Sequence, residues 1–466
     1  MFCHIINSER RSADSVTITN PRTNEAFCEV TVGRETDLND AVEAARASFE
    51  SWKLLSVEER QKYLLKLADE LERRRDEVHP TLAGETGKSN ILANMEIDNT
   101  LEFIRFNASQ SLPDKVDYET ETLKIISTHH PIGVVGAVCP WNFPLVLAAC
   151  KIAAALVMGN SIIVKPSPFT PCATLKFAEL AASVLPRGLV QALNGDSEIG
   201  RLITIHPGID KISYTGSIPT GKKVAENAAK TLKRVTLELG GNDASVVCPD
   251  VDVKAVAAKV AAGSFFHSGQ MCVATKRVYV HESVFQEFRD TFVEAVKNIK
   301  IEPSDAQSPM FSPIQNGVKY KVVKDLIADC KENNYTLLCG GNADDEQPEL
   351  FIAPVVVDRP PDDSCIVKLE QFGPIIPLMT WSTEDEVIAR VNRTCTGLGA
   401  CVWSNDVGTA DRIARKIEVG TVWINSAEAP NPYGYCSGWK QSGIGGEWGN
   451  QGLLSYSHTQ IIQLCK

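Results

Sequence analysis

Short apolar runs alternate with helical patterns between residues 132 and 238, and this alternation constrains the fold more than any other feature of the chain. Helical patterns occupy 144–157 and 171–184. Such an order predicts an α/β domain with a mostly parallel sheet covered on both faces. Five runs have the length and composition of buried strands: 132–138, 161–165, 189–193, 211–214 and 235–238.

A second α/β set begins near residue 251. We expect a helix over 251–265, a strand over 277–280 and another helix that runs to about residue 297. Further elements continue to about residue 425. Two α/β sheets predict two domains, and a cleft between domains is a common place for a ligand. The 466 residues are enough for each domain to bury a core.

Charge and cysteine spacing exclude several classes of protein. The chain carries 47 Lys and Arg against 58 Asp and Glu, a net charge of −11. This balance argues against a nucleic-acid partner, whose phosphates would repel the chain. The 14 cysteines are scattered without a C-x-x-C pair. Zinc-ribbon and thioredoxin-like sites are therefore not expected, and no metal site is predicted.

The apolar stretches of the chain are those of a soluble protein. Residues 1–7 have neither the apolar core nor the cleavage site of a signal peptide. The longest apolar stretch, 145–158, is interrupted by Lys151 and is too short to span a bilayer. We expect a cytoplasmic protein with free thiols and no membrane partner.

Two glycine-rich loops suggest phosphate binding. Residues 216–222 match G-x-x-x-x-G-K, but Lys223 follows where a P-loop needs Ser or Thr for magnesium. An NTPase is therefore disfavoured. The glycines still suit a tight turn between a strand and a helix N-terminus, where a pyrophosphate can bind. The loop at 133–136 is too short for G-x-G-x-x-G.

Four segments place reactive side chains beside predicted strand or helix ends, although each also has an ordinary structural explanation. Asn142 lies between a strand and a helix, where its amide can donate to a ligand or complete a turn. Glu238 ends an apolar strand and precedes two glycines. Its carboxylate is either positioned near a cleft or is a solvated group at the end of a strand. Cys272 has small and polar neighbours that leave room to reach its thiol, whereas most cysteines are small buried residues. Glu370 and Phe372 lie at a turn, which turn chemistry alone explains.

Together these segments give the sequence a resemblance to the aldehyde dehydrogenase superfamily over nearly the whole chain. This resemblance distinguishes Cys272 from the other thiols and implies that it is a nucleophile. Seven segments carry it, in the order and at the spacing of the family: Pro140-Trp141-Asn142-Phe143-Pro144, Lys165-Pro166-Ser167, Tyr214-Thr215-Gly216-Ser217, Glu238-Leu239-Gly240-Gly241-Asn242, Gly269-Gln270-Met271-Cys272, Glu370-Gln371-Phe372-Gly373-Pro374 and Lys440-Gln441-Ser442-Gly443.

The resemblance implies a reaction that fits these residue types. A thiolate is the strongest side-chain nucleophile near neutral pH, so Cys272 would attack the aldehyde carbon and form a thiohemiacetal. Asn142 and the backbone N–H of Cys272 would stabilise the oxyanion. Hydride transfer to the cofactor would leave a thioester, and Glu238 would act as general base for its hydrolysis. Coenzyme-A-acylating relatives generally lack this base, so a free carboxylic acid is the expected product.

The same resemblance implies NAD or NADP as the cofactor. Glu370 would hold the nicotinamide ribose, and Phe372 would pack near the nicotinamide. Lys165 would contact the adenosine ribose, and Ser217 the pyrophosphate. The implied cofactor-binding set is Trp141, Lys165, Ser167, Gly216, Ser217, Gly221, Glu370 and Phe372.

One position bears on the choice between the two cofactors. Many NAD-preferring relatives carry Glu three residues after the lysine, whereas this chain has Pro168. Without a carboxylate there, a 2′-phosphate is not repelled and Lys165 is able to pair with it. The sequence predicts weak discrimination, with NAD first and NADP close behind.

A second departure from the family pattern lies near the C-terminus. Tyr435-Cys436-Ser437-Gly438 stands where relatives have Pro-Phe-Gly-Gly, and Gly446 replaces an Arg before Glu447. This loop lies near the aldehyde tunnel in relatives, so an unusual substrate is expected. The resemblance implies a tunnel wall of Phe143, Val146, Leu147, Cys150, Phe266, Met271, Val273 and Cys436.

This wall is apolar and has no obvious Arg for a second carboxylate. We therefore expect a neutral aliphatic or aromatic aldehyde as substrate. The alternative within the enzymes is an NADP-preferring semialdehyde dehydrogenase. The alternative of another class is a catalytically silent relative with a binding or structural role, against which the intact set of Cys272, Glu238 and Asn142 argues.

The resemblance also implies an architecture of three parts. A Rossmann-like NAD(P)-binding domain would comprise residues 1–115 and 133–241, and an α/β catalytic domain residues 242–440. Residues 116–132 and 452–466 would form a small β arm for oligomerisation, with a C-terminal strand over about 452–464. An edge strand that pairs with another subunit is no longer exposed, and a homodimer or homotetramer is implied.

Overall fold

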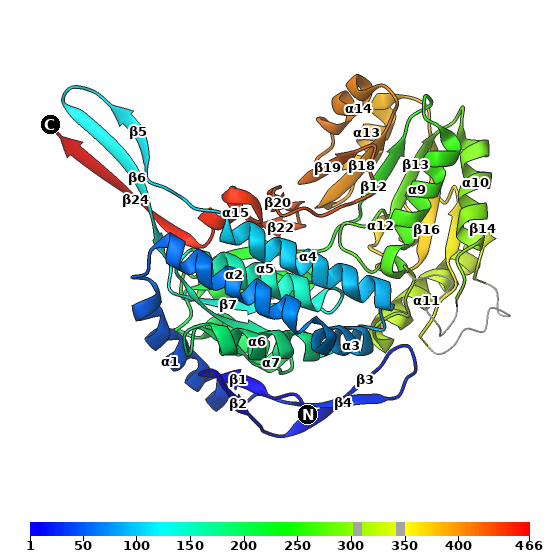
Figure 1. The fold of residues 1–466 in the computed structure, drawn as a ribbon. Coiled ribbons are helices and arrows are strands. Elements are labelled where there is room, and N and C mark those ends of the chain that lie inside the picture. Colours follow the sequence, from blue (N-terminus) through cyan, green and yellow to red (C-terminus); the bar gives the residue numbers. More distant parts are fainter. Residues whose placement is uncertain (302–309, 342–349) are drawn as a thin grey trace.

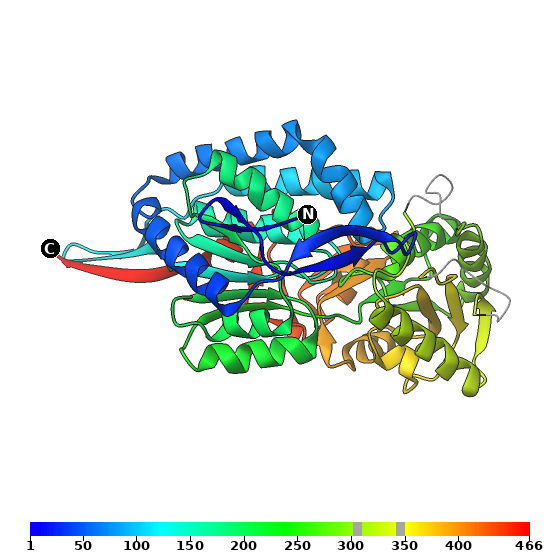
Figure 2. The ribbon, with the colours of Figure 1, turned by 90° about the horizontal axis from the view of Figure 1, so that it is seen from below.

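The computed structural model describes residues 1–301, 310–341 and 350–466. Two helix-covered sheets form adjacent bodies, and a narrow arm projects from the first of them (Figure 1). The view from below shows the same arrangement, with the arm pointing away from the second body (Figure 2). This is the α/β architecture with a β arm that the sequence predicts.

The first sheet has eight strands in the order β2-β1-β9-β8-β7-β10-β11-β22. Its five central strands are parallel. Among these five, the chain forms β7 first, continues outward to β9, and then crosses to the other side of β7 to form β10. This reversal beside β7 is a topological switch point, where open α/β sheets bind ligands. The strands are β1 (His4–Ile6), β2 (Glu9–Arg11), β7 (Val134–Val138), β8 (Ser161–Lys165), β9 (Val190–Ala192), β10 (Lys211–Thr215), β11 (Arg234–Glu238) and β22 (Gly443–Ile444).

Alternation along these strands sends side chains into two separate cores. Val134 and Ile163 face one core, whereas Val135 and Ile162 face the other. The sheet is thus buried on both sides, which explains why its strands read as continuous apolar runs. Helices α1 (Glu35–Trp52), α7 (Ser197–Ile205) and α8 (Ile218–Ala229) cover one face, and α2 (Val57–Arg73), α3 (Arg75–Thr86), α4 (Asn90–Ala108), α5 (Pro144–Val157) and α6 (Cys172–Val184) cover the other.

The second sheet is also covered on both faces, in the strand order β14-β15-β16-β13-β12-β18-β19. Helices α9 (Val253–Phe265) and α10 (Phe285–Lys297) pack on one face. The other face carries α11 (Gly317–Glu332), α13 (Glu384–Asn392) and α14 (Val407–Ala414). The strands are β12 (Ala244–Val247), β13 (Arg277–His281), β14 (Thr336–Cys339), β15 (Val355–Asp358), β16 (Ile375–Trp381), β18 (Gly399–Trp403) and β19 (Thr421–Ile424).

The arm joins two segments that are far apart in the sequence. Strand β6 (Leu123–Pro131) pairs with β5 (Lys115–Glu119) on one side and with β24 (Ser457–Cys465) on the other. The expected C-terminal strand over 452–464 begins later than predicted, because α15 (Gly449–Leu454) occupies its first residues. On β24, Ile461 and Leu464 are about half exposed, at 51% and 47%.

Short elements complete the fold. Across the described residues, no helix is both long and apolar enough to cross a membrane. The remaining elements are β3 (Ser15–Thr19), β4 (Ala26–Thr31), the 3₁₀ turn η1 (Phe266–Gly269), α12 (Cys365–Lys368), β17 (Thr396–Gly397), β20 (Cys436–Ser437), β21 (Trp439–Lys440) and β23 (Gly446–Glu447).

Candidate active site

Strand register brings the predicted polar residues of the first domain to one edge of its sheet. Val138 at the end of β7 pairs with Lys165 at the end of β8. On the other side of β7, Thr215 at the end of β10 pairs with Glu238 at the end of β11. The carboxyl ends of these parallel strands therefore meet at the switch point, where ligands bind in such sheets.

The thiol of Cys272 comes from the second domain, on a turn with an uncommon backbone. His267, Ser268 and Gly269 in η1 have φ values of 48°, 57° and 72°, in the left-handed region that ordinary side chains avoid. A Cβ on Gly269 would lie 2.7 Å from the carbonyl oxygen of Gly373. The turn passes so close to another backbone segment that only glycine fits at that position.

Buried amide and hydroxyl groups hold this turn in place. The side chain of Gln270 donates to the carbonyl oxygens of His267 and Pro313, each at 3.0 Å, and accepts from the backbone N–H of Gln315 at 2.9 Å. Ser312 accepts a hydrogen bond from Ser268 on its carbonyl oxygen and donates its own N–H to that hydroxyl. Such a network over-determines a strained backbone and so fixes the position of the residues that follow.

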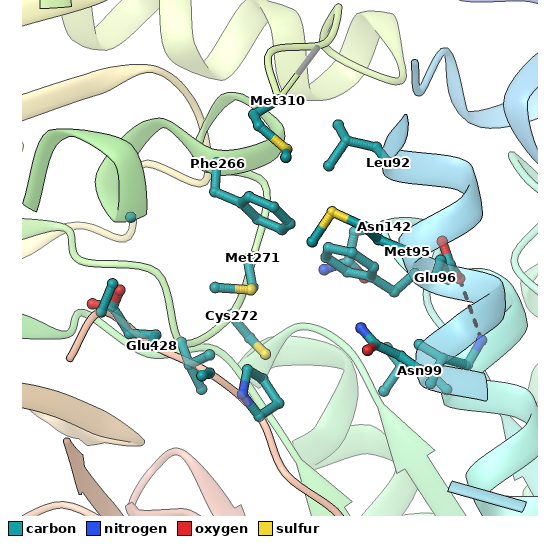
Figure 3. A pocket seen from close by; sticks show the side chains of 18 of the residues that line it. Leu92, Met95, Glu96, Asn99, Asn142, Phe266, Met271, Cys272, Met310 and Glu428 are labelled. Carbon is teal, nitrogen blue, oxygen red and sulfur yellow. Dashed lines mark hydrogen bonds between the residues drawn. The ribbon is translucent and has the colours of Figure 1, made fainter. Parts of the chain in front are cut away.

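A cavity of about 730 Å³ lies where the two domains meet, and Cys272 projects into it. In Figure 3, Leu92, Met95, Glu96 and Asn99 on α4 face Phe266, Met271 and Met310 across it. The cavity brings together the three predicted catalytic residues and the whole predicted tunnel wall: Cys272, Glu238 and Asn142, with Phe143, Val146, Leu147, Cys150, Phe266, Met271, Val273 and Cys436. Sequence reasoning missed the contribution of α4, because nothing in its pattern distinguishes a cavity face from a core face.

Electrostatics at the thiol favour a neutral resting state. Burial raises the pKa of Cys272 well above its ordinary value, and the charge of Glu238 raises it further. Burial likewise raises the pKa of Glu238 to about 7, while the nearby Lys151 ammonium opposes that rise. Within the described part of the chain, Oε1 of Glu238 has no hydrogen-bond partner. A proton acceptor that titrates near neutral pH thus lies beside a protonated thiol.

Asn142 offers an amide donor in the same cavity. It is 4% exposed, and its Nδ2 donates to the carbonyl oxygen of Gln270 at 3.0 Å. A side-chain amide has two N–H groups, so one remains for another acceptor. The backbone carbonyl of Asn142 accepts from Lys88 at 2.7 Å. Both ends of the residue are therefore fixed.

Two buried lysines at the site escaped the sequence reasoning. Lys276 donates to the carbonyl oxygens of Met271 (3.1 Å), Cys272 (2.6 Å) and Ala274 (3.0 Å). These three bonds stabilise the loop around the nucleophile. Lys151 pairs with Glu447. A lone lysine inside the apolar stretch 145–158 was a usable signal, since a buried ammonium needs a partner. The sequence around Lys276 gave no such signal of a buried lysine.

The predicted cofactor residues lie along the switch-point edge and across the domain boundary. Lys165 is 4% exposed, and burial lowers its pKa to about 8. Its one hydrogen bond in the described part of the chain runs to Pro166 at 3.1 Å. The rings of Trp141 and Phe372 meet edge to face at 5.3 Å, one from each domain. Ser167 is buried and accepts from a backbone N–H within its own turn.

Ser217 and the two glycines of the predicted cofactor set lie in or beside the turn that precedes α8. Ser217 directly precedes α8, and its hydroxyl bonds to the hydroxyl of Thr220 at 3.1 Å. A Cβ on Gly216 would lie 2.3 Å from the Tyr214 hydroxyl, and one on Gly221 would lie 2.5 Å from Leu239. Close packing of α8 against Leu239 therefore explains Gly221 without a cofactor.

Glu370 is turned towards the backbone of the other domain. Its Oε1 accepts from the N–H of Gly241 at 3.2 Å and lies 3.8 Å from Lys276 Nζ. A Cβ on Gly240 would lie 2.2 Å from Oε2. Burial raises the pKa of this carboxyl, and the two neighbouring ammonium groups of Lys276 and Lys319 oppose the rise.

The two C-terminal departures from the family pattern lie opposite each other. Ser437 pairs with Gly446, and Cys436 pairs with Glu447, on β20 and β23. A Cβ on Gly446 would lie 2.4 Å from the carbonyl oxygen of Cys436 and 2.5 Å from the ring of Tyr435. The Cys436 backbone and the Tyr435 ring together leave no room for a larger side chain at 446, so the two changes are physically linked.

The described residues contain no cluster of three or more His, Cys, Asp or Glu that could hold a metal ion. The chemistry of the site is that of a thiol, a carboxyl and an amide around an apolar cavity, next to a dinucleotide-type sheet edge.

The chain is similar to known proteins over nearly its whole length. The model of the aldehyde dehydrogenase family matches residues 8–462. A putative aldehyde dehydrogenase of Gibberella fujikuroi is 39% identical over 100% of this chain and 99% of that protein. Retinaldehyde dehydrogenase 3 of Rattus norvegicus is 36% identical over 98% of this chain and 91% of its own.

A solved structure gives the same result for the fold. The NAD⁺ complex of an aldehyde dehydrogenase from Bacillus cereus superposes with a TM-score of 0.96 at 33% identity, covering 100% of this chain and 96% of that one. Motifs, fold and near-complete coverage agree, and the chain belongs to the aldehyde dehydrogenase family, whose members are oxidoreductases that oxidise aldehydes to acids with NAD(P).

Proposed function

We propose that Cys272 is the nucleophile, Glu238 the general base and Asn142 an oxyanion donor in the oxidation of an apolar aldehyde to its carboxylic acid. One observation carries this assignment: a single cavity collects the three side chains from three segments of both domains. A nucleophile, a base and an amide donor around one apolar space are what acyl chemistry at a carbonyl requires.

The first step is attack on the aldehyde. Burial keeps the Cys272 thiol protonated at rest, so the thiol needs a nearby base, and Glu238 with its pKa of about 7 is able to take the proton. The oxyanion that forms is stabilised by the second N–H of Asn142 and by the backbone N–H of Cys272. Loss of one such donor typically costs about 3 kcal/mol of transition-state stabilisation.

The residues at the switch point fit a dinucleotide. Lys165 is a buried ammonium with donors to spare, and Trp141 and Phe372 form an aromatic wall between the domains. Lys165, Ser167, Gly216, Ser217, Glu370, Trp141 and Phe372 would hold NAD or, second, NADP. A nicotinamide bound there would supply the hydride acceptor, and loss of hydride from the thiohemiacetal carbon would leave a thioester on Cys272. After Glu238 has released the thiol proton to solvent, it takes a proton from the water molecule that attacks the thioester, and this attack releases the free acid and the Cys272 thiol group.

The cavity supports a neutral aliphatic or aromatic substrate. No lysine or arginine is among the described residues that line it, whereas four glutamates are: Glu96, Glu238, Glu428 and Glu447. Glu96 and Glu447 are already paired with Lys88 and Lys151, which leaves Glu238 and Glu428, among these described residues, as the acids without a lysine partner of this kind. A substrate with its own carboxylate would gain no cation there and would face these acids. This favours the neutral aldehyde over a semialdehyde.

The arm supports assembly into a homodimer or homotetramer. Ile461, Ile462 and Leu464 on β24 are exposed apolar side chains along a strand edge. Such an edge presents unpaired backbone groups with which a strand of another chain can pair. Sedimentation velocity of the purified protein measures the oligomeric state directly.

A panel of aldehydes tests the reaction. Hexanal, benzaldehyde, betaine aldehyde and succinic semialdehyde are assayed for NADH and NADPH formation and for the released acid. We expect the two neutral aldehydes to be oxidised best. Cys272→Ala should reduce turnover about a thousandfold or more, while Cys248→Ala, at a buried core position away from the cavity, should leave it unchanged.

Three results would contradict the proposal. Retained activity in Cys272→Ala would refute the mechanism. Succinic semialdehyde as the best substrate would refute the substrate class. Complete inactivity of the wild-type protein on every aldehyde, with NAD bound, would favour the catalytically silent alternative.

A further inference from the structure

A buried ion pair lies directly behind the loop that carries Asn142. The side chains of Lys88 and Glu96 are both fully buried and are bonded to each other. Lys88 also donates to the backbone carbonyl of Asn142 at 2.7 Å, and its ammonium lies 3.8 Å from the centre of the Phe143 ring. Lys88 lies in the connection between α3 and α4, and Glu96 lies on α4. The reaction as proposed uses neither residue.

The second oxygen of Glu96 binds the start of α5. Its Oε1 accepts from the backbone N–H groups of Leu145 (2.9 Å) and Val146 (3.3 Å). Phe143, which precedes this helix, offers no side-chain cap of its own. Glu96 therefore caps α5 from a different helix, at the end where a negative charge is favoured.

These contacts fix Asn142 from behind. Lys88 holds its carbonyl, Glu96 holds the two N–H groups three and four residues further on, and Gln270 binds one N–H of its amide. An oxyanion donor contributes only when it is aimed at the developing charge before the reaction. The aim of the remaining N–H depends on where the backbone of Asn142 lies.

We propose that Glu96 and Lys88 are positioning residues that hold Asn142 in place as the oxyanion donor. The inference rests on the role proposed above for Asn142. It assigns a functional reason to a buried charged pair, which is otherwise weak support for stability.

The chain offers a matched control in Glu85. This carboxyl is also fully buried, lies at the end of α3 and caps α6 through the N–H groups of Cys172 (2.5 Å) and Ala173 (2.8 Å). It makes the same kind of contact from the same helix pair but has no bond to Asn142. Glu85→Gln therefore reports the structural cost of losing a buried cap.

The test compares Glu96→Gln, Lys88→Met and Glu85→Gln with Asn142→Ala and the double variant Asn142→Ala/Glu96→Gln. Each is assayed for kcat and KM with the best aldehyde and for the rate at which iodoacetamide alkylates Cys272. Alkylation needs the same thiol but forms no oxyanion. A general distortion of the cavity would slow both reactions, whereas misplacement of Asn142 slows only aldehyde oxidation.

We expect Glu96→Gln and Lys88→Met to lower kcat about tenfold or more, short of the hundredfold or greater loss for a whole donor, with alkylation unchanged. Glu85→Gln should keep kcat close to that of the wild type. In the Asn142→Ala background, Glu96→Gln should cost nothing further, because the group it positions is gone. If Glu96→Gln does not fold, Lys88→Met decides, since it leaves the cap on α5.

Unchanged kcat in the folded positioning variants, or an equal loss in Glu85→Gln, would overturn the inference while leaving Asn142 its role. Additive losses in the double variant would do the same. Full activity in Asn142→Ala would instead overturn the role of Asn142, and the inference with it.

Discussion

Lys151 and Glu447 form a buried ion pair between α5 and β23, in which Nζ lies 2.7 Å from both carboxylate oxygens. The side chains are 0% and 7% exposed. Ser213 donates to the same carboxylate, and the Tyr456 hydroxyl lies 3.4 Å away. Glu447 follows the divergent Gly446, so this pair anchors the unusual loop to the first domain.

Removal of Lys151 should be strongly destabilising. Lys151→Met leaves the Glu447 carboxylate buried without its cation, and a broken buried pair costs about 3–5 kcal/mol. The free energy of unfolding from chemical denaturation measures this loss. The double variant Lys151→Met/Glu447→Gln removes both charges and should recover part of it. Equal stability of the single and double variants would contradict the prediction.

Turnover should depend on the ionisation of Glu238. Its pKa is raised to about 7 by burial, and only the deprotonated carboxyl accepts a proton. Activity should therefore rise with pH through about 7 and level off above it. A pH profile of kcat measures this rise, which forms the acidic limb of the profile. Glu238→Gln should remove the limb together with most of the activity.

The same limb offers a second check. Lys151 lowers the pKa of Glu238, so its loss should move the limb to higher pH. A limb that stays in place in folded Lys151→Met would show that another group is titrating.

Gly269→Ala should disturb the nucleophile turn. The residue has φ of +72°, and a Cβ there would lie 2.7 Å from the backbone oxygen of Gly373. The left-handed conformation alone costs an ordinary residue about 1–2 kcal/mol, and the close contact adds to that cost. We expect a lower free energy of unfolding and a lower kcat.

Gly317 provides the matched control for this substitution. It lies at the start of α11, and a Cβ there would meet nothing within 4 Å. Gly317→Ala should stabilise the protein by about 0.4–1 kcal/mol. Similar effects of the two alanines would show that the turn is not strained.

Cofactor preference should respond to the residue after the Lys165 motif. Pro168 is exposed and brings no carboxylate to this edge of the sheet. Pro168→Glu introduces a charge that repels a 2′-phosphate, so kcat/KM for NADP should fall about tenfold, which corresponds to about 1.4 kcal/mol. The value for NAD should be retained, and a wild-type protein that already rejects NADP strongly would contradict the predicted weak discrimination.

Some elements could be read from the sequence only in part. The long amphipathic pattern over 57–78 predicts one helix, but the structure breaks it at Arg74 into α2 and α3. A hydrophobic stripe indicates which residues are buried. When two consecutive helices both face the core, the stripe continues across the break between them and does not reveal it. Ser283 and Gln286 have the spacing of a capping box, which predicts a helix with Ser283 as its N-cap. This prediction is wrong in position, because α10 begins at Phe285 without a side-chain cap.

The sequence by itself determined the fold class, the family and the identity of Cys272, Glu238 and Asn142 as candidates. These depend on local signals: strand and helix periodicity, and motifs a few residues long. The tertiary structure alone decided how Lys88, Glu96 and Lys151 are used, because each binds groups brought close by the fold. Contacts such as Lys88 to Asn142 or Lys151 to Glu447 span 54 and 296 residues. No local pattern encodes a partner at such a separation, since only the packing of distant segments decides which buried charges meet.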